Sequence, residues 1–196
     1  MKRLIVLLCA LYLVPAHGTA FAESPTTAAL SNIPPAWSKI LQCDTNACPR
    51  FELIMGGAAV LDHETGLVWE KSPDNRRRIW IVASQLCYQK ELGGRKGWRL
   101  PTVEELSSLI DPAQIDPALP PGHPFDNVQT RRDIFGSYEL DYYWTTTTEA
   151  GTQVGNIGNA WYVGFYNGTV GSDIKNYNDR LLWCVRSGRG YDGPHD

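Results

Sequence analysis

Polar and aromatic side chains that could bind a ligand gather near the C-terminal end of the chain. Phenol, carboxylate and amide groups recur there at short spacing: Tyr162, Tyr166, Asp173, Asn176, Asn178 and Asp179. Flat aromatic rings suit stacking against a sugar, and carboxylate and amide oxygens bond hydroxyl groups or hold a calcium ion. We therefore predict a ligand-binding surface here. The alternative is that the polar side chains are only solvated loop residues, and no motif of a calcium site supports that cofactor.

Cysteine chemistry is the second signal. Four cysteines follow the apolar N-terminus, and four thiols allow three connectivities: Cys43, Cys48, Cys87 and Cys184. Cys43 and Cys48 enclose a loop short enough to close locally, which leaves Cys87 to pair with Cys184. A zinc site is the weaker interpretation because no histidine is spaced with a cysteine as such sites require. We predict two structural disulfides and no metal site.

Motifs of catalysis and of nucleic-acid binding are missing. The chain holds no G-x-S-x-G, no H-E-x-x-H and no Cys/His arrangement of the nucleophilic type. A pair of catalytic carboxylates stays open, since its members need not be close in sequence. The only basic cluster is Arg76–Arg78, and we interpret it as a solvated turn before a helix. We predict a protein that is not an enzyme and has no nucleic-acid partner.

The stretch Gly97–Leu106 organises the elements that must position these residues. Apolar side chains flank an arginine at residues 98–100, the alternation of a strand with one buried face. Thr102 and Glu105 then have the spacing of a capping box, in which each side chain satisfies a free backbone N–H of the other residue. A strand should therefore run directly into a short helix that ends near Ile110.

The second predicted helix covers Ile79–Leu92 and directs Cys87 toward the core. Tryptophans are expected to fill that core: Trp69, Trp80, Trp98, Trp144, Trp161 and Trp183. Strands are predicted from periodicity and turn signals at 51–55, 58–61, 67–69, 142–148, 161–166 and 181–186. The last of these strands carries Cys184.

Loops separate the predicted strands. Residues 112–141 form a long proline-containing segment, and a connection of this length is usually functional or disordered. Asn167–Gly168 predicts a type I′ turn after residues 161–166, which would direct Tyr162 and Tyr166 outward. Residues 171–179 are predicted to be a polar loop.

The N-terminal segment has the pattern of a secretory signal peptide over residues 1–22. A basic start and a short apolar run precede Ala20–Ala22, an A-x-A cleavage site. An extended lead-in should follow at 23–50, then one domain at 51–188 and a flexible tail at 189–196. We predict an exported protein, periplasmic or secreted, that does not span a membrane after the signal is removed.

The landmarks resemble those of a known family. They are Thr65–Trp69, Ala83 with Cys87, the Gly97–Leu106 block, Tyr143–Thr145, Ala160–Trp161 with Phe165 and Asn167–Gly168, and Trp183–Arg186. Together they resemble the Lcl C-terminal domain family, named for the end domain of a bacterial collagen-like adhesin. The resemblance implies a C-type-lectin-like, α+β fold with two helices, a small antiparallel sheet and a long irregular loop region. It also implies a helix-to-last-strand disulfide, for which Cys87 and Cys184 occupy matching places.

The resemblance leaves three functions to compare. The first is a non-catalytic binding module that recognises an extracellular or envelope ligand, including a glycan, although the Glu-Pro-Asn and Gln-Pro-Asp triplets of calcium-dependent lectins are absent. The second is a structural or assembly component of the cell envelope that binds a protein partner. The third is an enzyme like the formylglycine-generating proteins, which depend on paired active-site cysteines. The namesake's collagen-like repeats are also absent, which weakens an adhesin role.

Overall fold

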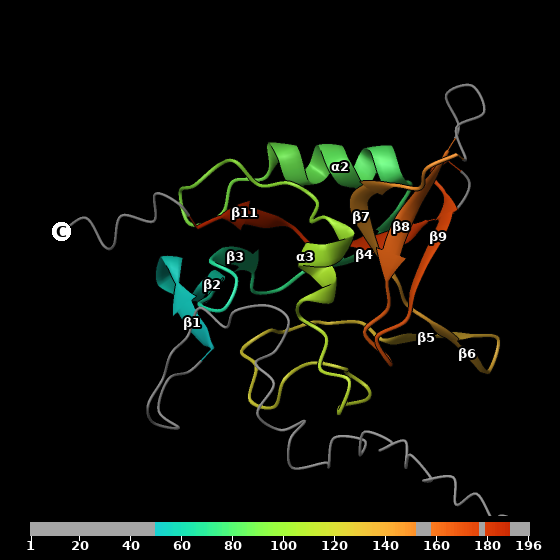
Figure 1. Cartoon of the computed structure of the whole chain (residues 1–196), viewed down its shortest axis with the longest axis horizontal. Coiled ribbons are helices and arrows are strands. Elements are labelled where there is room, and N and C mark those ends of the chain that lie inside the picture. The colour runs from blue at the N-terminus through green and yellow to red at the C-terminus, as the bar shows by residue number, and fades with distance from the viewer. Residues whose placement is uncertain (1–49, 152–157, 177–178, 189–196) are drawn as a thin grey trace, which may run out of the picture. The chain divides into compact units, whose positions relative to one another are not determined.

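The computed structural model describes residues 50–151, 158–176 and 179–188 (Figure 1). The predicted signal peptide, Cys43, Cys48, Asn178 and the predicted tail lie outside these ranges. Eleven strands and two α-helices form within them, so the fold is α+β with strands predominating. The helices are α2 (Trp80–Gln89) and α3 (Val103–Ser107). The strands are β1 (Phe51–Ile54), β2 (Ala59–Asp62), β3 (Leu67–Glu70), β4 (Asp74–Arg78), β5 (Arg131–Ile134), β6 (Ser137–Leu140), β7 (Tyr143–Thr148), β8 (Asn159–Val163), β9 (Val170–Ile174), β10 (Arg180–Leu182) and β11 (Val185–Ser187), and a 3-10 turn, η1 (Met55–Gly57), follows β1.

Two sheets and a separate hairpin replace the single small sheet that was expected. The first sheet has the order β1-β2-β3-β11, the second has the order β4-β10-β7-β8-β9, and β5 pairs only with β6. All pairs are antiparallel except β7 with β10. That parallel pair forms because β10 enters the second sheet from a distant part of the chain, where no hairpin dictates its direction.

The prediction of one continuous final strand at 181–186 is wrong. Residues 180–182 belong to the second sheet and 185–187 to the first, so the chain passes between sheets at Trp183 and Cys184. Both of these side chains are fully buried. The Trp183 indole N–H donates to the Glu70 carbonyl at 2.8 Å, and the Cys184 carbonyl accepts from the Glu70 N–H at 3.0 Å. These bonds to β3 hold the crossing point in place.

The capping box is confirmed. The Thr102 hydroxyl accepts from the Glu105 N–H at 3.2 Å, and the Glu105 carboxylate accepts from the Thr102 N–H at 2.8 Å. Both helices are shorter than predicted. Helix α2 ends at Gln89 because Lys90 is extended, and α3 ends at Ser107. Arg99 forms a single bridge with Val185 instead of lying in a regular strand.

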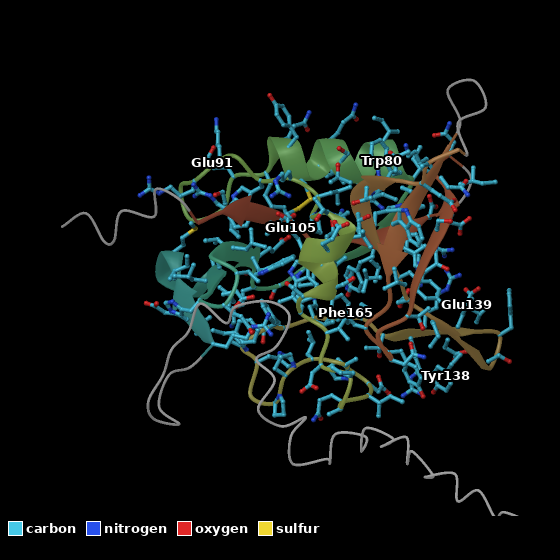
Figure 2. All side chains as sticks on the ribbon, in the orientation of Figure 1. Trp80, Glu91, Glu105, Tyr138, Glu139 and Phe165 are labelled. Atoms are coloured by element: carbon cyan, nitrogen blue, oxygen red, sulfur yellow. A yellow bond between two sulfur atoms is a disulfide. The ribbon has the colours of Figure 1, made fainter. Side chains whose placement is uncertain are left out.

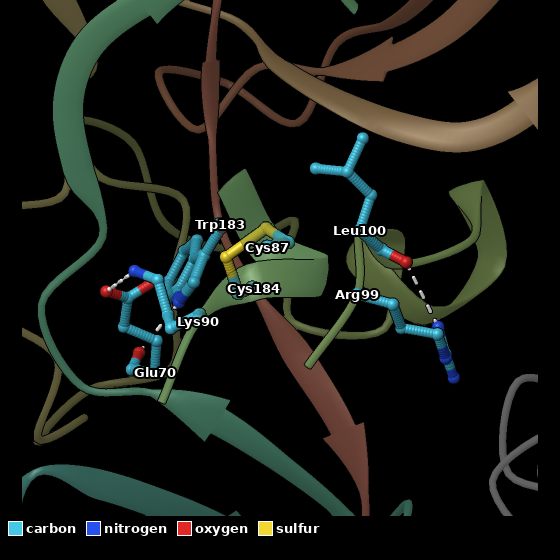
Figure 3. The surroundings of a disulfide bond; sticks show 7 residues. All are labelled: Glu70, Cys87, Lys90, Arg99, Leu100, Trp183 and Cys184. Carbon is cyan, nitrogen blue, oxygen red and sulfur yellow. Dashed lines mark hydrogen bonds and ion pairs between the residues drawn. A yellow bond between two sulfur atoms is a disulfide. The ribbon is translucent and has the colours of Figure 1, made fainter. Parts of the chain in front are cut away.

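The predicted Cys87–Cys184 disulfide is present and ties α2 to the crossing between the two sheets (Figure 3). Glu70 and Lys90 form an ion pair beside it. Burial raises the pKa of the Glu70 carboxyl, although the hydrogen bond from Lys90 lowers it in part. Four of the six predicted core tryptophans are fully buried, whereas Trp80 and Trp161 are only partly buried.

The turn predicted at Asn167–Gly168 is wrong. Val163 pairs with Val170, so a six-residue loop at 164–169 joins β8 to β9. Phe165 is the reason: its ring is fully buried against Tyr143 at 5.4 Å and Trp183 at 5.2 Å between ring centroids, which draws the loop into the core.

Three further stretches differ from the prediction. Arg76–Arg78 lies in β4 rather than in a turn. Half of the polar loop predicted at 171–179 is β9, the edge strand of the second sheet. The segment 112–141 is irregular only up to Thr130, where the β5–β6 hairpin begins. Only Arg76–Arg78 owes its conformation to a strand distant in sequence, β10, whereas β9 and β5 pair with their neighbours in the chain, β8 and β6.

Candidate functional site

Two of the predicted site residues meet in an aromatic and charged group that we name the Arg180 cluster: Tyr142, Tyr162, Asp173 and Arg180. The two tyrosine rings lie 4.6 Å apart between centroids. The Arg180 guanidinium carbon lies 5.0 Å from the Tyr142 ring and 5.1 Å from the Tyr162 ring. The Asp173 carboxylate forms an ion pair with Arg180. The side chains of Tyr162, Asp173 and Arg180 thus link strands β8, β9 and β10.

Register explains why this cluster can form. Tyr162 on β8 pairs with Gly171 on β9. A Cβ atom at Gly171 would lie 2.6 Å from the Tyr162 hydroxyl oxygen, so a larger residue would push the phenol out of the cluster. Burial is the main cause of a raised pKa at Tyr162. Tyr162 is therefore partly buried, and its ring packs against Tyr142 and Arg180 instead of being a solvated loop side chain.

Tyr166 belongs to a second group, the Arg131 cluster, which also contains Asp116, Arg131 and Tyr138. The Arg131 guanidinium carbon lies 5.2 Å from the Tyr138 ring and 5.3 Å from the Tyr166 ring. Asp116 forms an ion pair with Arg131. Unlike the Arg180 cluster, this one is open to solvent: Tyr138 is 72% exposed, and the side chains of Arg131 and Asp116 are 41% and 30% exposed.

Hydrogen bonds to buried groups fix the Arg131 cluster. The Asp116 N–H donates to the Tyr166 carbonyl at 2.8 Å, which joins the proline-containing segment to the loop 164–169. The Gln129 N–H donates to the hydroxyl of Tyr143 at 2.6 Å, and Tyr143 is fully buried. Burial raises the pKa of Tyr143, so its phenol stays neutral. The strand that carries Arg131 therefore begins at a point anchored in the core.

The hairpin that presents Tyr138 projects from the second sheet (Figures 1 and 2). Its pairs run from Arg131 with Leu140 to Ile134 with Ser137. At its base the Asp141 N–H donates to the Thr130 carbonyl at 2.9 Å, and the Asp141 carboxylate pairs with Arg77 of β4. The pKa of Arg77 is lowered to about 10, mainly by burial and next by the positive charge of Arg132.

Two further predicted residues flank strands of the second sheet. Asn176 follows β9 and Asp179 precedes β10, and both are exposed. In the described ranges, no group of three or more His, Cys, Asp and Glu side chains is placed to hold a metal ion. No helix of those ranges has the length and apolar character needed to cross a membrane.

Sequence reasoning missed three members of the Arg131 cluster. Asp116 and Arg131 were assigned to an irregular segment, as was Tyr138. Local sequence gives little signal for this hairpin, because Phe135–Gly136 lacks the Asn or Asp that favours a two-residue turn and the run Arg131–Ile134 does not alternate polar and apolar side chains. The approach of Tyr166 to this hairpin has no counterpart in local sequence, because β7 and β8 separate the hairpin from the loop that carries Tyr166.

Comparison with known proteins places these clusters in a family. The model of the Lcl C-terminal domain matches residues 58–186. The matched segment begins one residue before β2 and ends within β11, so it includes the second sheet, the first sheet except β1 and Ser187, the hairpin and every residue of the two clusters. No curated protein and no solved structure matches the chain.

Proposed function

The chain belongs to the Lcl C-terminal domain family, and we propose that it is an exported, non-catalytic binding module that recognises a glycan through the Arg131 cluster. The observation that carries this proposal is the placement of Tyr138. Its ring is largely exposed on a paired hairpin, next to a guanidinium and a carboxylate that are themselves partly exposed. An apolar ring and charged hydrogen-bonding groups are thus offered to solvent at one place.

This combination matches the chemistry of a sugar. A pyranose ring has an apolar C–H face and a rim of hydroxyl groups. Tyr138 supplies a flat surface for the apolar face. Arg131 donates and Asp116 accepts hydrogen bonds, and bonds that involve a charged partner are roughly twice as strong as neutral ones. Because the cluster is already fixed by the core, little side-chain order would have to be gained on binding.

The six residues predicted from sequence take different roles in this proposal. The Tyr166 ring packs against the Arg131 guanidinium and contributes its phenol to the surface. Tyr162 and Asp173 hold β8 and β9 in the position that presents the neighbouring loop. Asn176 and Asp179 are exposed beside the ends of β9 and β10, away from the loop that carries Tyr166, and are not part of this surface, whereas Asn178 lies outside the described residues. Calcium has no part in the proposal, because the carboxylates of both clusters are already paired with arginines.

Export and a C-type-lectin-like fold are part of the same proposal. The signal-peptide pattern of residues 1–22 supports export, as does a disulfide, since such bridges persist in oxidising compartments. The bridge from α2 to the last strands and the irregular stretch before β5 support the fold. Catalysis of the formylglycine-generating kind would need a reactive cysteine pair, whereas Cys87 and Cys184 are bonded to each other and fully buried.

A glycan array tests the proposal. The mature protein from residue 23 would be compared with Tyr138→Ala and with Tyr88→Ala, a matched control because Tyr88 on α2 is 80% exposed. We expect saturable binding that Tyr138→Ala weakens about tenfold or more, as loss of an aromatic hot spot does. Tyr88→Ala and added EDTA should leave the binding unchanged.

Two results would contradict this function. One is the absence of any bound glycan for a protein whose circular dichroism shows that it is folded. The other is a bound glycan whose affinity is the same in Tyr138→Ala and in the wild type, since the site would then lie elsewhere.

A further inference from the structure

The tip of the β5–β6 hairpin carries an unusual residue. Ile134 pairs with Ser137, so the turn consists of Phe135 and Gly136 alone. Both have positive φ, 50° and 81°, as a type I′ turn requires. The Phe135 side chain is fully exposed at this tip. Figure 1 shows the hairpin extending away from the second sheet.

Phenylalanine is poorly suited to this position in the isolated protein. The first central position of a type I′ turn favours Asn, Asp or Gly, because these tolerate the left-handed conformation. A bulky residue at positive φ is an outlier and is strained. The ring also gains no burial here, so it leaves apolar surface in water. Neither the turn nor the core of this domain accounts for a phenylalanine at residue 135.

The hairpin nevertheless holds the backbone of Phe135 in one conformation. The Asp133 carboxylate accepts from the Gly136 N–H at 2.9 Å, which closes the turn from the side. Arg132 and Glu139 form an ion pair across the two strands. The Glu139 pKa is lowered, chiefly by the hydrogen bond from Arg132. A residue whose backbone is held in this way loses less conformational freedom on binding than one in an unpaired loop.

We propose that Phe135 is the anchor of a protein–protein interface and inserts into an apolar pocket of a second, folded protein. The charged residues beside it, Arg132, Asp133 and Glu139, would lie at the rim of that contact. A buried aromatic surrounded by polar rim residues is the usual arrangement of an interface hot spot. Burial in the pocket would offset the strain and the exposure that the free protein carries.

A lipid surface fits the same tip less well. The four charged side chains of the hairpin are two arginines and two acids, Arg131, Arg132, Asp133 and Glu139, so the hairpin has no net charge to attract anionic lipids. A single myristoyl chain gives an association constant with membranes of only about 10⁴ M⁻¹, which is marginal. One phenyl group buries less apolar surface than that chain, and the neighbouring Ile134 is only partly exposed.

The proposal is independent of the glycan site. Arg131 and Tyr138 lie on one face of the hairpin, and their contact leads back toward Tyr166. Phe135 lies at the opposite end of the hairpin from Arg131. Failure of one function can therefore be distinguished from failure of the other by separate variants.

The experiment begins with substitutions that keep the turn. Phe135→Asn supplies a residue that suits positive φ, so we expect its melting temperature to rise by about 3 °C and its glycan binding to match the wild type. Phe135→Leu keeps an apolar side chain. A photoreactive benzoylphenylalanine would be placed at residue 135, and at Tyr88 as a control that is also largely exposed, in cells that export the protein. We expect a protein adduct specific to residue 135.

The affinity between this protein and the purified cross-linked partner then tests the proposal. The partner found at residue 135 should bind the wild type at least tenfold more tightly than Phe135→Asn, with Phe135→Leu in between and Tyr88→Asn unchanged. The proposal is overturned by equal affinities, or by adducts that are no more frequent at 135 than at 88. It is also overturned if the tip instead binds vesicles of phosphatidylcholine and phosphatidylglycerol, or if the adduct is a second copy of this chain and light scattering shows a dimer.

Discussion

Removal of the Cys87–Cys184 bridge should strongly destabilise the domain. The bridge joins residues 97 apart in sequence. In the chain-entropy model, closing a loop of this length restricts the unfolded chain enough to stabilise the fold by about 4–5 kcal/mol. Whole domains are stable by only about 5–15 kcal/mol. Both cysteines are fully buried, so a serine would add an unsatisfied hydroxyl group, and alanine is the better replacement.

Urea unfolding of the double variant Cys87→Ala, Cys184→Ala measures this loss. With a urea dependence of about 2 kcal/mol per molar, we expect the midpoint to fall by about 2 M. The single variant Cys87→Ala is the control, because it breaks the same bridge with half the change in side-chain volume and should fall by nearly as much. A loss below about 1 kcal/mol would refute the reasoning, as would a peptide map of the wild type that joins Cys184 to another cysteine.

Two other predictions concern the elements that position the hairpin surface. Phe165→Ala should reduce the free energy of unfolding by about 3–5 kcal/mol, the range for a buried aromatic. It should also weaken glycan binding, because it frees the loop that carries Tyr166. An unchanged melting temperature would contradict the burial of this ring. Glu105 gives a pH dependence: burial raises its pKa, but the hydrogen bonds from Arg99 and Thr102 lower it more, so the net shift is downward. Its contribution to stability should therefore be complete above the unfolded value of about 4.5 and be lost as the pH falls through the lower folded value. The unfolding free energies of the wild type and of Glu105→Gln should thus converge in acid, and a difference that is constant from neutral pH to acid would refute this assignment.

Local sequence was sufficient wherever neighbouring residues satisfy one another. The capping box of α3 needs only Thr102 and Glu105, because both of its hydrogen bonds lie within one helical turn. The position of α2 followed from helical spacing that placed Cys87 inward. Cys184 then followed as the partner left over. The family resemblance gave the α+β class and agrees with the family match over residues 58–186.

Only the tertiary structure decided how the chain is divided between its sheets. Residues 180–187 have the composition of one strand, yet hydrogen bonds with the Glu70 backbone hold the chain between two sheets at Trp183 and Cys184. The six-residue loop after β8 has the same kind of cause. Burial of Phe165 against two distant aromatic rings outweighs the local preference of Asn167–Gly168 for a tight turn.

The candidate site shows the same division. Its hairpin closes through a two-residue turn, but Phe135 is not a residue that favours such a turn, so local sequence did not predict it. The Arg131 cluster could not be predicted from local sequence. Its four residues come from three separate stretches that only the tertiary structure brings together: Asp116, Arg131 with Tyr138, and Tyr166. The sequence determined which side chains are available for binding. Long-range burial and strand pairing determined which of them share a surface, because these contacts depend on residues too far along the chain for any local pattern to record.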